Sequence, residues 1–237
     1  MNYKLDPFIE GLKEFHISLS DHQMKQFIQY YEMLIEKNKV MNLTAITDFD
    51  EVITKHFLDS LSLVKVIDLQ ENLSLLDLGT GAGFPGIPLK IAFPNLKITL
   101  ADSLQKRILF LRDVIQQLGI TDIEAIHCRA EEYARQNHIR ETFDLCVSRA
   151  VANLSTLSEY CLPFVKSNGL FISYKSGEID EEVKNANHAI HVLGGKVIHI
   201  ERFDLGESKR SFICIKKIKN TPNIYPRKAG TPSKNPL

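Results

Sequence analysis

Apolar residues follow a helical spacing in the first part of the chain. They recur at helical intervals between Ser20 and Val40, and Ser20 with Gln23 after it has the spacing of a capping box. A second helical pattern runs from about Asp50 to Ile67. The region before residue 70 is therefore predicted to be helical.

After residue 70, short apolar runs alternate with helical segments. The runs LSLLDL, LKITLAD, IEAIHC, FDLCVS and LFISYK are predicted to be strands. Strands that alternate with helices indicate an α/β fold with a mostly parallel sheet. A polar helix is expected from Ile179 to Leu193. The two runs after it, KVIHIERF and SFICIKKI, are joined too briefly for a helical crossover, so we expect them to pair antiparallel.

The end of the chain has a different composition. Residues 220–237, NTPNIYPRKAGTPSKNPL, are rich in Pro, Lys and Asn, which predicts an extended tail. Together with the change of pattern near residue 70, this divides the chain into three parts. They are an N-terminal helical region (1–70), a sheet domain (71–219) and a basic tail (220–237).

The stretch LLDLGTGAGFPGIPL, residues 75–89, places three glycines between a predicted strand, Leu73 to Leu78, and a predicted helix, Gly86 to Phe93, which itself begins with a fourth. Glycine lets the backbone take positive φ and approach a ligand closely, and the helix start offers unpaired N–H donors. Such a strand-to-helix turn is typical of a site for a nucleotide-like cofactor.

Two cofactors compete for this turn. GAGFPG matches the dinucleotide pattern G-x-G-x-x-G, with Asp102 suitably downstream to hold a ribose. However, Asp77 lies just before the glycines, where a carboxylate disfavours a pyrophosphate and favours the cationic S-adenosylmethionine. In that case Gly79, Gly81 and Gly83 let the backbone approach the methionine part. Asp102 then accepts hydrogen bonds from the ribose, although capping of the next helix explains this residue equally well.

Composition and charge narrow the class of protein. The 237 residues are 44% hydrophobic, enough for one large domain or a domain with an appendage. We see no signal peptide or membrane-length apolar run, so a cytoplasmic protein without a membrane partner is expected. The four cysteines are far apart without a C-x-x-C pair, which favours buried thiols over disulfides or a metal site.

The formal net charge is zero but unevenly distributed. Eight of the 29 basic residues lie from Lys209 onward, where there is no Asp or Glu, which leaves 21 basic against 29 acidic residues before it. A basic end suggests a polyanionic partner such as nucleic acid, and a solubilising or weakly ordered end is an equally good explanation.

Seven motifs, in this order, resemble those of the bacterial small-subunit ribosomal RNA guanine-N7 methyltransferases, once called the glucose-inhibited division protein B family. The motifs are NLTAIT, KHFLDSL, LLDLGTGAGFPGIPLKI, DSLQKRILFL, RAEEY, SRAVANL and KNTPNIYPRKAGTPSKNPL. The resemblance covers essentially the whole chain. It implies a Rossmann-like class I S-adenosylmethionine-dependent methyltransferase fold with an N-terminal helical extension and a terminal antiparallel strand pair. It also implies methylation of 16S ribosomal RNA, free or in the ribosomal particle, and we expect a monomer.

The family's cofactor-binding positions match Gly79, Phe84, Ala130, Glu131 and Arg149. Phe84 can wall the pocket or belong to the core. The adenine edge is expected at Ala130 and Glu131, after the strand IEAIHC, with helix capping as the alternative for Glu131. Arg149 suits a phosphate, a base edge or a cofactor carboxylate, or alternatively an ion pair.

Guanine N7 carries an in-plane lone pair and no proton, so the reaction requires no general base and we assign none. His56, Asp59 and Ser60 share one helix face and are candidates for the RNA side of the pocket; docking of that face on the sheet is the alternative. Lys175 is a further candidate for RNA contact. Two other functions remain open: an RNA-binding or assembly protein that binds cofactor without turnover, and a nicotinamide-dependent oxidoreductase.

Overall fold

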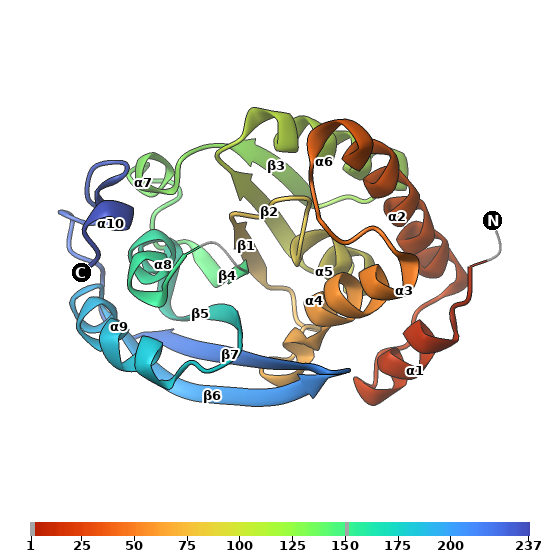
Figure 1. The fold of residues 1–237 in the computed structure, drawn as a ribbon. Coiled ribbons are helices and arrows are strands. Elements are labelled where there is room, and N and C mark those ends of the chain that lie inside the picture. Colours follow the sequence, from red (N-terminus) through yellow and green to blue (C-terminus); the bar gives the residue numbers. More distant parts are fainter. Residues whose placement is uncertain (1–2, 150–151) are drawn as a thin grey trace.

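The computed structural model describes residues 3–149 and 152–237. Residues 150 and 151, which belong to the motif SRAVANL, lie outside the described residues. A central sheet is covered by helices on both faces, and the two ends of the chain lie on opposite sides of the molecule (Figure 1). Among the described residues, no helix has the length and apolar character to cross a membrane.

The sheet has seven strands in the order β3-β2-β1-β4-β5-β7-β6. Strands β1 to β5 are parallel, and β7 runs antiparallel to both β5 and β6, which confirms the predicted terminal pair. The predicted fold class is confirmed. The strands are β1 (Ser74–Leu78), β2 (Lys97–Asp102), β3 (Ile123–His127), β4 (Phe143–Arg149), β5 (Val165–Ser176), β6 (Gly195–Leu205) and β7 (Ser208–Lys217).

The N-terminal region is helical, as predicted. It comprises α1 (Asp6–Glu14), α2 (Asp21–Met41), α3 (Phe49–Val52), a π-helix (Ile53–Leu58), α4 (Asp59–Leu61) and a 3₁₀-helix (Ser62–Lys65). The predicted capping box is present, because the Ser20 hydroxyl accepts from the Gln23 backbone and the Gln23 side chain accepts from the Ser20 backbone. The helix expected from residue 50 to 67 is thus a chain of short helical segments of different types.

The remaining helices follow the strands. They are α5 (Gly86–Ala92), α6 (Gln105–Leu118), α7 (Ala130–Tyr133), α8 (Leu154–Cys161), a 3₁₀-helix (Leu162–Phe164), α9 (Asp180–Val192) and α10 (Thr231–Lys234). Neighbouring residues of β1 point to opposite faces. Leu75 belongs to a core shared with α1, α2, α5 and α6, whereas Leu76 belongs to a second core shared with α8 and α9. The N-terminal helices therefore share a core with one face of the sheet.

Residues 221–237, which we call the C-terminal strap, are packed against the molecule rather than extended into solvent. Arg135 and Arg140, from the connection between α7 and β4, donate to backbone carbonyls of Pro226 (2.6 Å) and Thr221 (2.7 Å). The strap then forms the short helix α10 beside α7 and α8 (Figure 1). The expectation of an extended tail is wrong, because these distant arginines satisfy the strap's backbone.

Candidate active site

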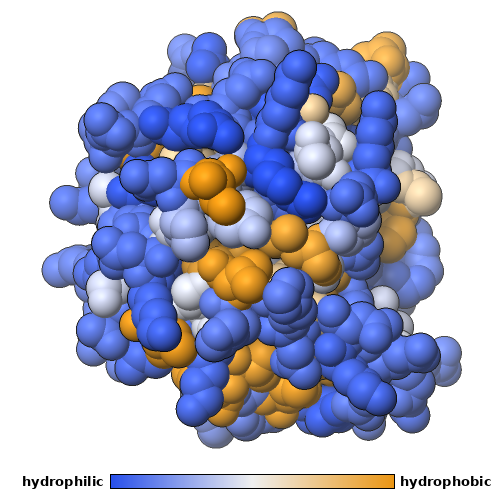
Figure 2. Space-filling view, turned by 90° about the vertical axis from the view of Figure 1, so that its left-hand side faces the viewer, coloured by the Kyte–Doolittle hydropathy of each residue, from blue (hydrophilic) through white to orange (hydrophobic). Residues whose placement is uncertain are grey.

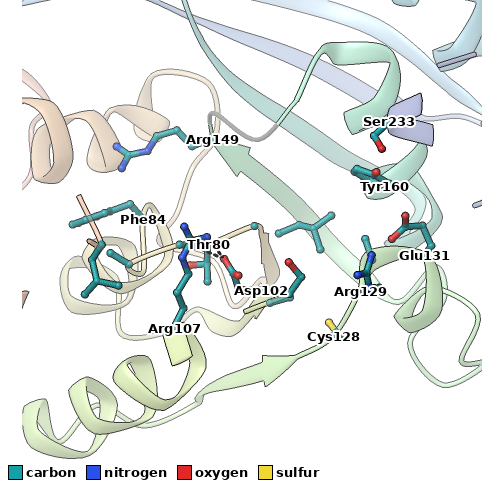
Figure 3. A pocket seen from close by; sticks show the side chains of 18 of the residues that line it. Thr80, Phe84, Asp102, Arg107, Cys128, Arg129, Glu131, Arg149, Tyr160 and Ser233 are labelled. Carbon is teal, nitrogen blue, oxygen red and sulfur yellow. Dashed lines mark hydrogen bonds and ion pairs between the residues drawn. The ribbon is translucent and has the colours of Figure 1, made fainter. Parts of the chain in front are cut away.

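A cavity of about 550 Å³ opens at the carboxyl ends of β1 to β4 (Figure 3). In a mostly parallel sheet this edge is where ligands bind, next to the point where strand order reverses. Eight of the sequence-predicted residues line the cavity: His56, Gly79, Gly81, Phe84, Asp102, Ala130, Glu131 and Arg149. Four do not belong to its lining: Gly83, Asp59, Ser60 and Lys175.

The glycine loop connects β1 to α5 with left-handed backbone conformations. Gly79, Gly81 and Gly83 have φ values of 73°, 63° and 109°, which favour glycine. A Cβ on Gly81 would meet nothing within 4 Å, so this part of the loop leaves room at the cavity. The Tyr30 hydroxyl of α2 supports the loop from the other side by donating to the Ala82 carbonyl (2.7 Å).

Gly83 has a different role from the one expected. A Cβ there would lie 2.7 Å from Ile87, 2.8 Å from the Tyr30 hydroxyl and 2.9 Å from Leu111. Gly83 therefore faces the core, and its missing side chain permits close packing of α2, α5 and α6 rather than approach to a ligand.

Asp77 lies beneath the loop and does not line the cavity. Its Oδ2 accepts from the Thr80 hydroxyl (2.6 Å) and from the Gly86 backbone (2.9 Å), whereas Oδ1 has no hydrogen-bond partner among the described residues. Burial raises the pKa of this carboxyl from 3.8 to about 6, against the opposing effect of its hydrogen bonds to Thr80 and Gly86. Asp77 thus ties together the two ends of the loop.

Asp102 ends β2 in the middle of the cavity (Figure 3). Its Oδ2 accepts from Gly81 N (3.0 Å) and pairs with Arg107 (3.1 Å), and its Oδ1 accepts from Leu104 N (2.9 Å). Since a carboxylate offers about four lone-pair sites, one acceptor site remains for a ligand hydroxyl, and displacement of Arg107 frees a second. The carboxylate supports both the glycine loop and the start of α6 while it faces the cavity.

Phe84, His56 and Arg149 form a stack at one end of the cavity. The His56 ring lies 4.5 Å from the Phe84 ring at an interplanar angle of 21°, and the Arg149 guanidinium lies 5.1 Å from the same ring. Burial and the nearby Arg149 lower the pKa of His56 to about 4, so the imidazole is neutral at pH 7. We call this end, together with Gly79 and Gly81, the loop end of the cavity.

Asp59 and Ser60 are buried behind this stack. Asp59 pairs with Arg149 and with Arg210 of β7, each at 2.7 Å, and the Ser60 hydroxyl donates to the His56 carbonyl (2.6 Å). Of the predicted helix face, only His56 reaches the cavity. The Asp59 side chain docks that helix on the sheet domain, which was the alternative explanation, whereas the Ser60 hydroxyl bonds within the helix and its backbone carbonyl accepts from Tyr174 of β5 (3.0 Å).

Lys175 is also engaged away from the cavity. Its ammonium group pairs with Glu182 of α9 (2.6 Å) and donates to the Ala152 carbonyl (3.0 Å). Since the Lys175 side chain is only 12% exposed, it serves to connect β5 with α9. Lys175 therefore lies outside the lining of the cavity, and its role as a candidate for RNA contact stays a prediction.

The opposite end of the cavity is formed by α7, α8 and the C-terminal strap. Ala130 and Glu131 face Tyr160 of α8 and Gly230 and Ser233 of the strap. The Glu131 Oε1 accepts from the Gly230 backbone (2.9 Å). Figure 3 shows Glu131, Tyr160 and Ser233 together on the side opposite Phe84 and Arg149. We call Ala130, Glu131, Tyr160, Gly230 and Ser233 together the strap end.

Several lining residues were missed by the sequence analysis. Thr44 holds the His56 ring through a contact of 2.9 Å to Nε2, and Cys128 follows β3 with a thiol whose pKa is raised by burial to about 12. The motif NLTAIT contains Thr44 and the tail motif contains Gly230 and Ser233. Both motifs stand out in the sequence, but no local pattern indicates that they meet at the cavity. The other lining residues not expected include Arg107, Arg129 and Tyr160.

The strand order, the glycine loop and the cavity together define a Rossmann-like fold of the class I S-adenosylmethionine-dependent methyltransferases. A crystal structure titled as a SAM dependent methyltransferase from Aquifex aeolicus matches it with a TM-score of 0.54 and 18% identity, over 73% of this chain and 96% of that one. In sequence, a model of the family rRNA small subunit methyltransferase G, also called GidB, matches residues 23–213.

Full-length relatives carry the same name. The ribosomal RNA small subunit methyltransferase G of Lachnoclostridium phytofermentans is 54% identical over 97% of this chain and 96% of its own length. The protein of that name from Desulforamulus reducens is 50% identical over 96% of each chain. The chain therefore belongs to the rRNA small subunit methyltransferase G family, and the resemblance found in the sequence is confirmed.

Proposed function

We propose that this protein transfers a methyl group from S-adenosylmethionine to N7 of a guanine in small-subunit (16S) ribosomal RNA. The observation that carries the proposal is the cavity at the edge of the parallel sheet. It has a glycine loop and an Arg–aromatic stack at one end and a buried carboxylate at the other. The family membership and the methyltransferase fold support it.

The residues present fit this cofactor. Gly79 and Gly81 let the backbone approach the methionine part, since nothing lies within 4 Å of a Cβ on Gly81. Asp102 holds the ribose with its remaining acceptor sites. Ala130 and Glu131 bind the adenine edge, and Phe84 walls the cavity. The Arg149 guanidinium is available to the cofactor carboxylate or to the target base on the side not occupied by Asp59.

The reaction requires positioning of the reacting atoms rather than proton transfer. S-adenosylmethionine supplies a methyl group that is already activated toward a nucleophile, and guanine N7 attacks it without losing a proton. Alignment of the reacting atoms can contribute on the order of 7–11 kcal/mol. The Phe84–His56 stack offers a flat apolar wall against which a base packs, and the neutral imidazole adds no charge that repels the methylated base.

The direct test is labelled methyl transfer to small ribosomal subunits from a strain that lacks this protein, followed by mapping of the modified base. We expect one labelled guanine, methylated at N7. Label on another atom or on the large subunit contradicts the proposal. Calorimetry adds a second criterion: S-adenosylmethionine is expected to bind and NADH is not, whereas the reverse result would contradict the proposal and favour an oxidoreductase.

A cofactor-binding protein without turnover would bind S-adenosylmethionine and RNA but leave the subunits unlabelled, so the same two measurements separate this alternative. We further propose that the enzyme acts as a monomer in the cytoplasm, where its substrate is assembled. Light scattering after size exclusion is expected to give the mass of one chain, 27.0 kDa, and a dimer mass would contradict that part of the proposal.

A further inference from the structure

The C-terminal strap is held by a buried ion pair. The Glu159 side chain of α8 is only 1% exposed. Its Oε1 accepts from the Arg227 backbone N (2.7 Å) and from Arg227 Nε (3.0 Å). Its Oε2 accepts from Arg227 Nη2 (2.7 Å) and from Nε (3.1 Å). A forked, fully hydrogen-bonded pair of this kind fixes direction as well as distance. The chain is therefore pinned three residues before Gly230.

Further contacts hold the strap on both sides of this pair. Before it, Arg140 donates to the Tyr225 carbonyl (3.0 Å), and after it, the buried Thr156 hydroxyl donates to the Pro232 carbonyl (3.0 Å). The Arg227 Nη2 also donates to the Asn235 carbonyl (2.8 Å), which folds the end of the strap back over α10. The segment between these anchors is thus fixed in place over α8.

The fixed segment contributes directly to the cavity. Gly230 and Ser233 line it, and the Gly230 N–H donates to Glu131 Oε1 at 2.9 Å. Glu131 is 6% exposed and belongs to the residues to which we assign the adenine edge. One carboxylate oxygen is therefore held by the strap, which leaves Oε2 to accept from a ligand amino group. Figure 2 shows that the face carrying the strap is mostly hydrophilic, with hydrophobic residues gathered in its middle.

We propose that the C-terminal strap is part of the cofactor site, and that Arg227 is a positioning residue that acts through Gly230 on Glu131. The ion pair with Glu159 places the Gly230 N–H, and this N–H orients the Glu131 carboxylate toward the adenine amino group. This inference rests on the proposed function, because it takes the cavity to be the S-adenosylmethionine site. It assigns the strap a role in selecting adenine, beyond support of the fold.

The experiment measures binding of two matched ligands by calorimetry. S-adenosylhomocysteine carries the adenine amino group, whereas S-inosylhomocysteine has in its place a carbonyl oxygen, which accepts a hydrogen bond and cannot donate from that position to Glu131. The test variant is the double substitution Arg227→Gln with Glu159→Gln, which leaves neither a buried carboxylate nor an arginine without its partner. Lys219→Gln is the matched control, because it removes a positive charge from an exposed residue just before the strap.

We expect the unsubstituted protein and the control to prefer S-adenosylhomocysteine. In the double variant the affinity for S-adenosylhomocysteine should fall on the order of tenfold, while that for S-inosylhomocysteine changes little, so that the preference shrinks. Equal losses for both ligands would show that the strap only supports the fold and would overturn the positioning role. Unchanged binding of both ligands would overturn the inference altogether.

Circular dichroism and thermal melting check that each variant folds. If the double variant does not fold, the single substitution Glu159→Gln decides in the same way, since it keeps the side-chain shape and Arg227, whose side chain is 22% exposed, reaches solvent. A failure of the proposed function looks different from a failure of this inference, because in that case the unsubstituted protein itself would not bind S-adenosylhomocysteine.

Discussion

The two ends of the cavity are built in different ways. At the loop end, Gly79 and Gly81 belong to one short turn between β1 and α5, and the stacked side chains are packed behind it by the N-terminal helices. At the strap end, Glu131 meets Gly230, which is 99 residues further along the chain. The backbone of the first end is a local turn, to which distant parts of the chain add His56 and Arg149, whereas the second end is made by long-range packing. A substitution at the loop end should therefore change a contact with the ligand directly. A substitution at the strap end should act indirectly, by shifting the position of Glu131.

The loop end can be broken most severely at Gly81. Gly81→Val places a branched side chain in the open space at the cavity and at a φ of 63°. We expect the affinity for S-adenosylmethionine to fall roughly a hundredfold, at the upper end of overpacking costs. Calorimetry measures the loss.

Gly119→Val is the matched control, because Gly119 has a φ of 62° and equally open space but ends α6. It should show a similar loss of stability without a loss of binding. Equal binding losses in both variants would attribute the effect to backbone strain and contradict the role of Gly81 at the cavity.

The support of the loop end can be broken at Asp59, which pairs with Arg149 and Arg210. Asp59→Asn leaves two guanidinium groups without their carboxylate. Their side chains are 16% and 20% exposed, so we expect a loss of about 2 kcal/mol in the free energy of unfolding, less than for a fully buried pair. Methyl transfer should fall as well, because Arg149 is no longer held.

Urea unfolding gives the stability change. Asp50→Asn, an exposed carboxylate on the same helical run, serves as control and should cost under about 0.5 kcal/mol. If Asp59→Asn is as stable as this control, the buried network contributes no net stability.

The difference between the two ends also explains what the sequence could predict. The strand and helix that flank the glycine loop were expected at residues 73–78 and 86–93 and are found at Ser74–Leu78 and Gly86–Ala92. Glycine chemistry and apolar patterns act over a few residues, so the turn could be recognised from its own sequence. The role of Gly83 could not, because two of the three side chains that exclude a Cβ there, Tyr30 and Leu111, belong to helices distant in the sequence.

The strap shows the same limit more strongly. Its composition predicts an extended basic tail, yet Arg227 is neutralised by Glu159, a residue 68 positions earlier in the chain. A charge count along the sequence cannot show which basic residues are already paired. The π-helical segment Ile53–Leu58 was also not predicted, because the apolar spacing of an ordinary helix describes it nearly as well.

Two titratable groups have opposite pKa shifts: His56 at the loop end, and Asp77 beneath the glycine loop. The pKa of Asp77 is raised from 3.8 to about 6, so the folded state binds more protons there and this contribution to stability is lost as the pH rises from about 4 to 6. The pKa of His56 is lowered from 6.5 to about 4, so its contribution is lost as the pH falls through the same range. In the unsubstituted protein the two effects oppose each other.

Each group can be removed to reveal the other. With Asp77→Asn, urea unfolding at pH 4 to 6.5 should show a steeper loss of stability on acidification than the unsubstituted protein. With His56→Gln the difference should have the opposite sign. Identical pH profiles for all three proteins would contradict the shifted pKa values.

Because Asp77 does not line the cavity, Asp77→Asn should weaken the binding of S-adenosylmethionine and of the neutral S-adenosylhomocysteine equally. A larger loss for S-adenosylmethionine would show that Asp77 senses the sulfonium.

The smallest effect concerns the basic residues of the strap that remain exposed, Lys228 and Lys234. With Arg227 paired to Glu159, these two are the strap lysines available to phosphates on the RNA. Substitution of both by Gln should flatten the salt dependence of RNA binding by roughly one to two units. Cofactor affinity should not change, because neither side chain lines the cavity. Lys4→Gln with Lys13→Gln removes the same charge from α1 and the residue stretch just before it, and α1 lies on the other side of the molecule from α10 (Figure 1), so the slope should stay as it was. The measurement is RNA affinity across a salt series for both double variants.

A flattened slope in the strap variant alone shows that the strap faces RNA on its outside while its inside forms the cofactor site. Equal slopes in both variants would leave the strap with contacts to the protein only.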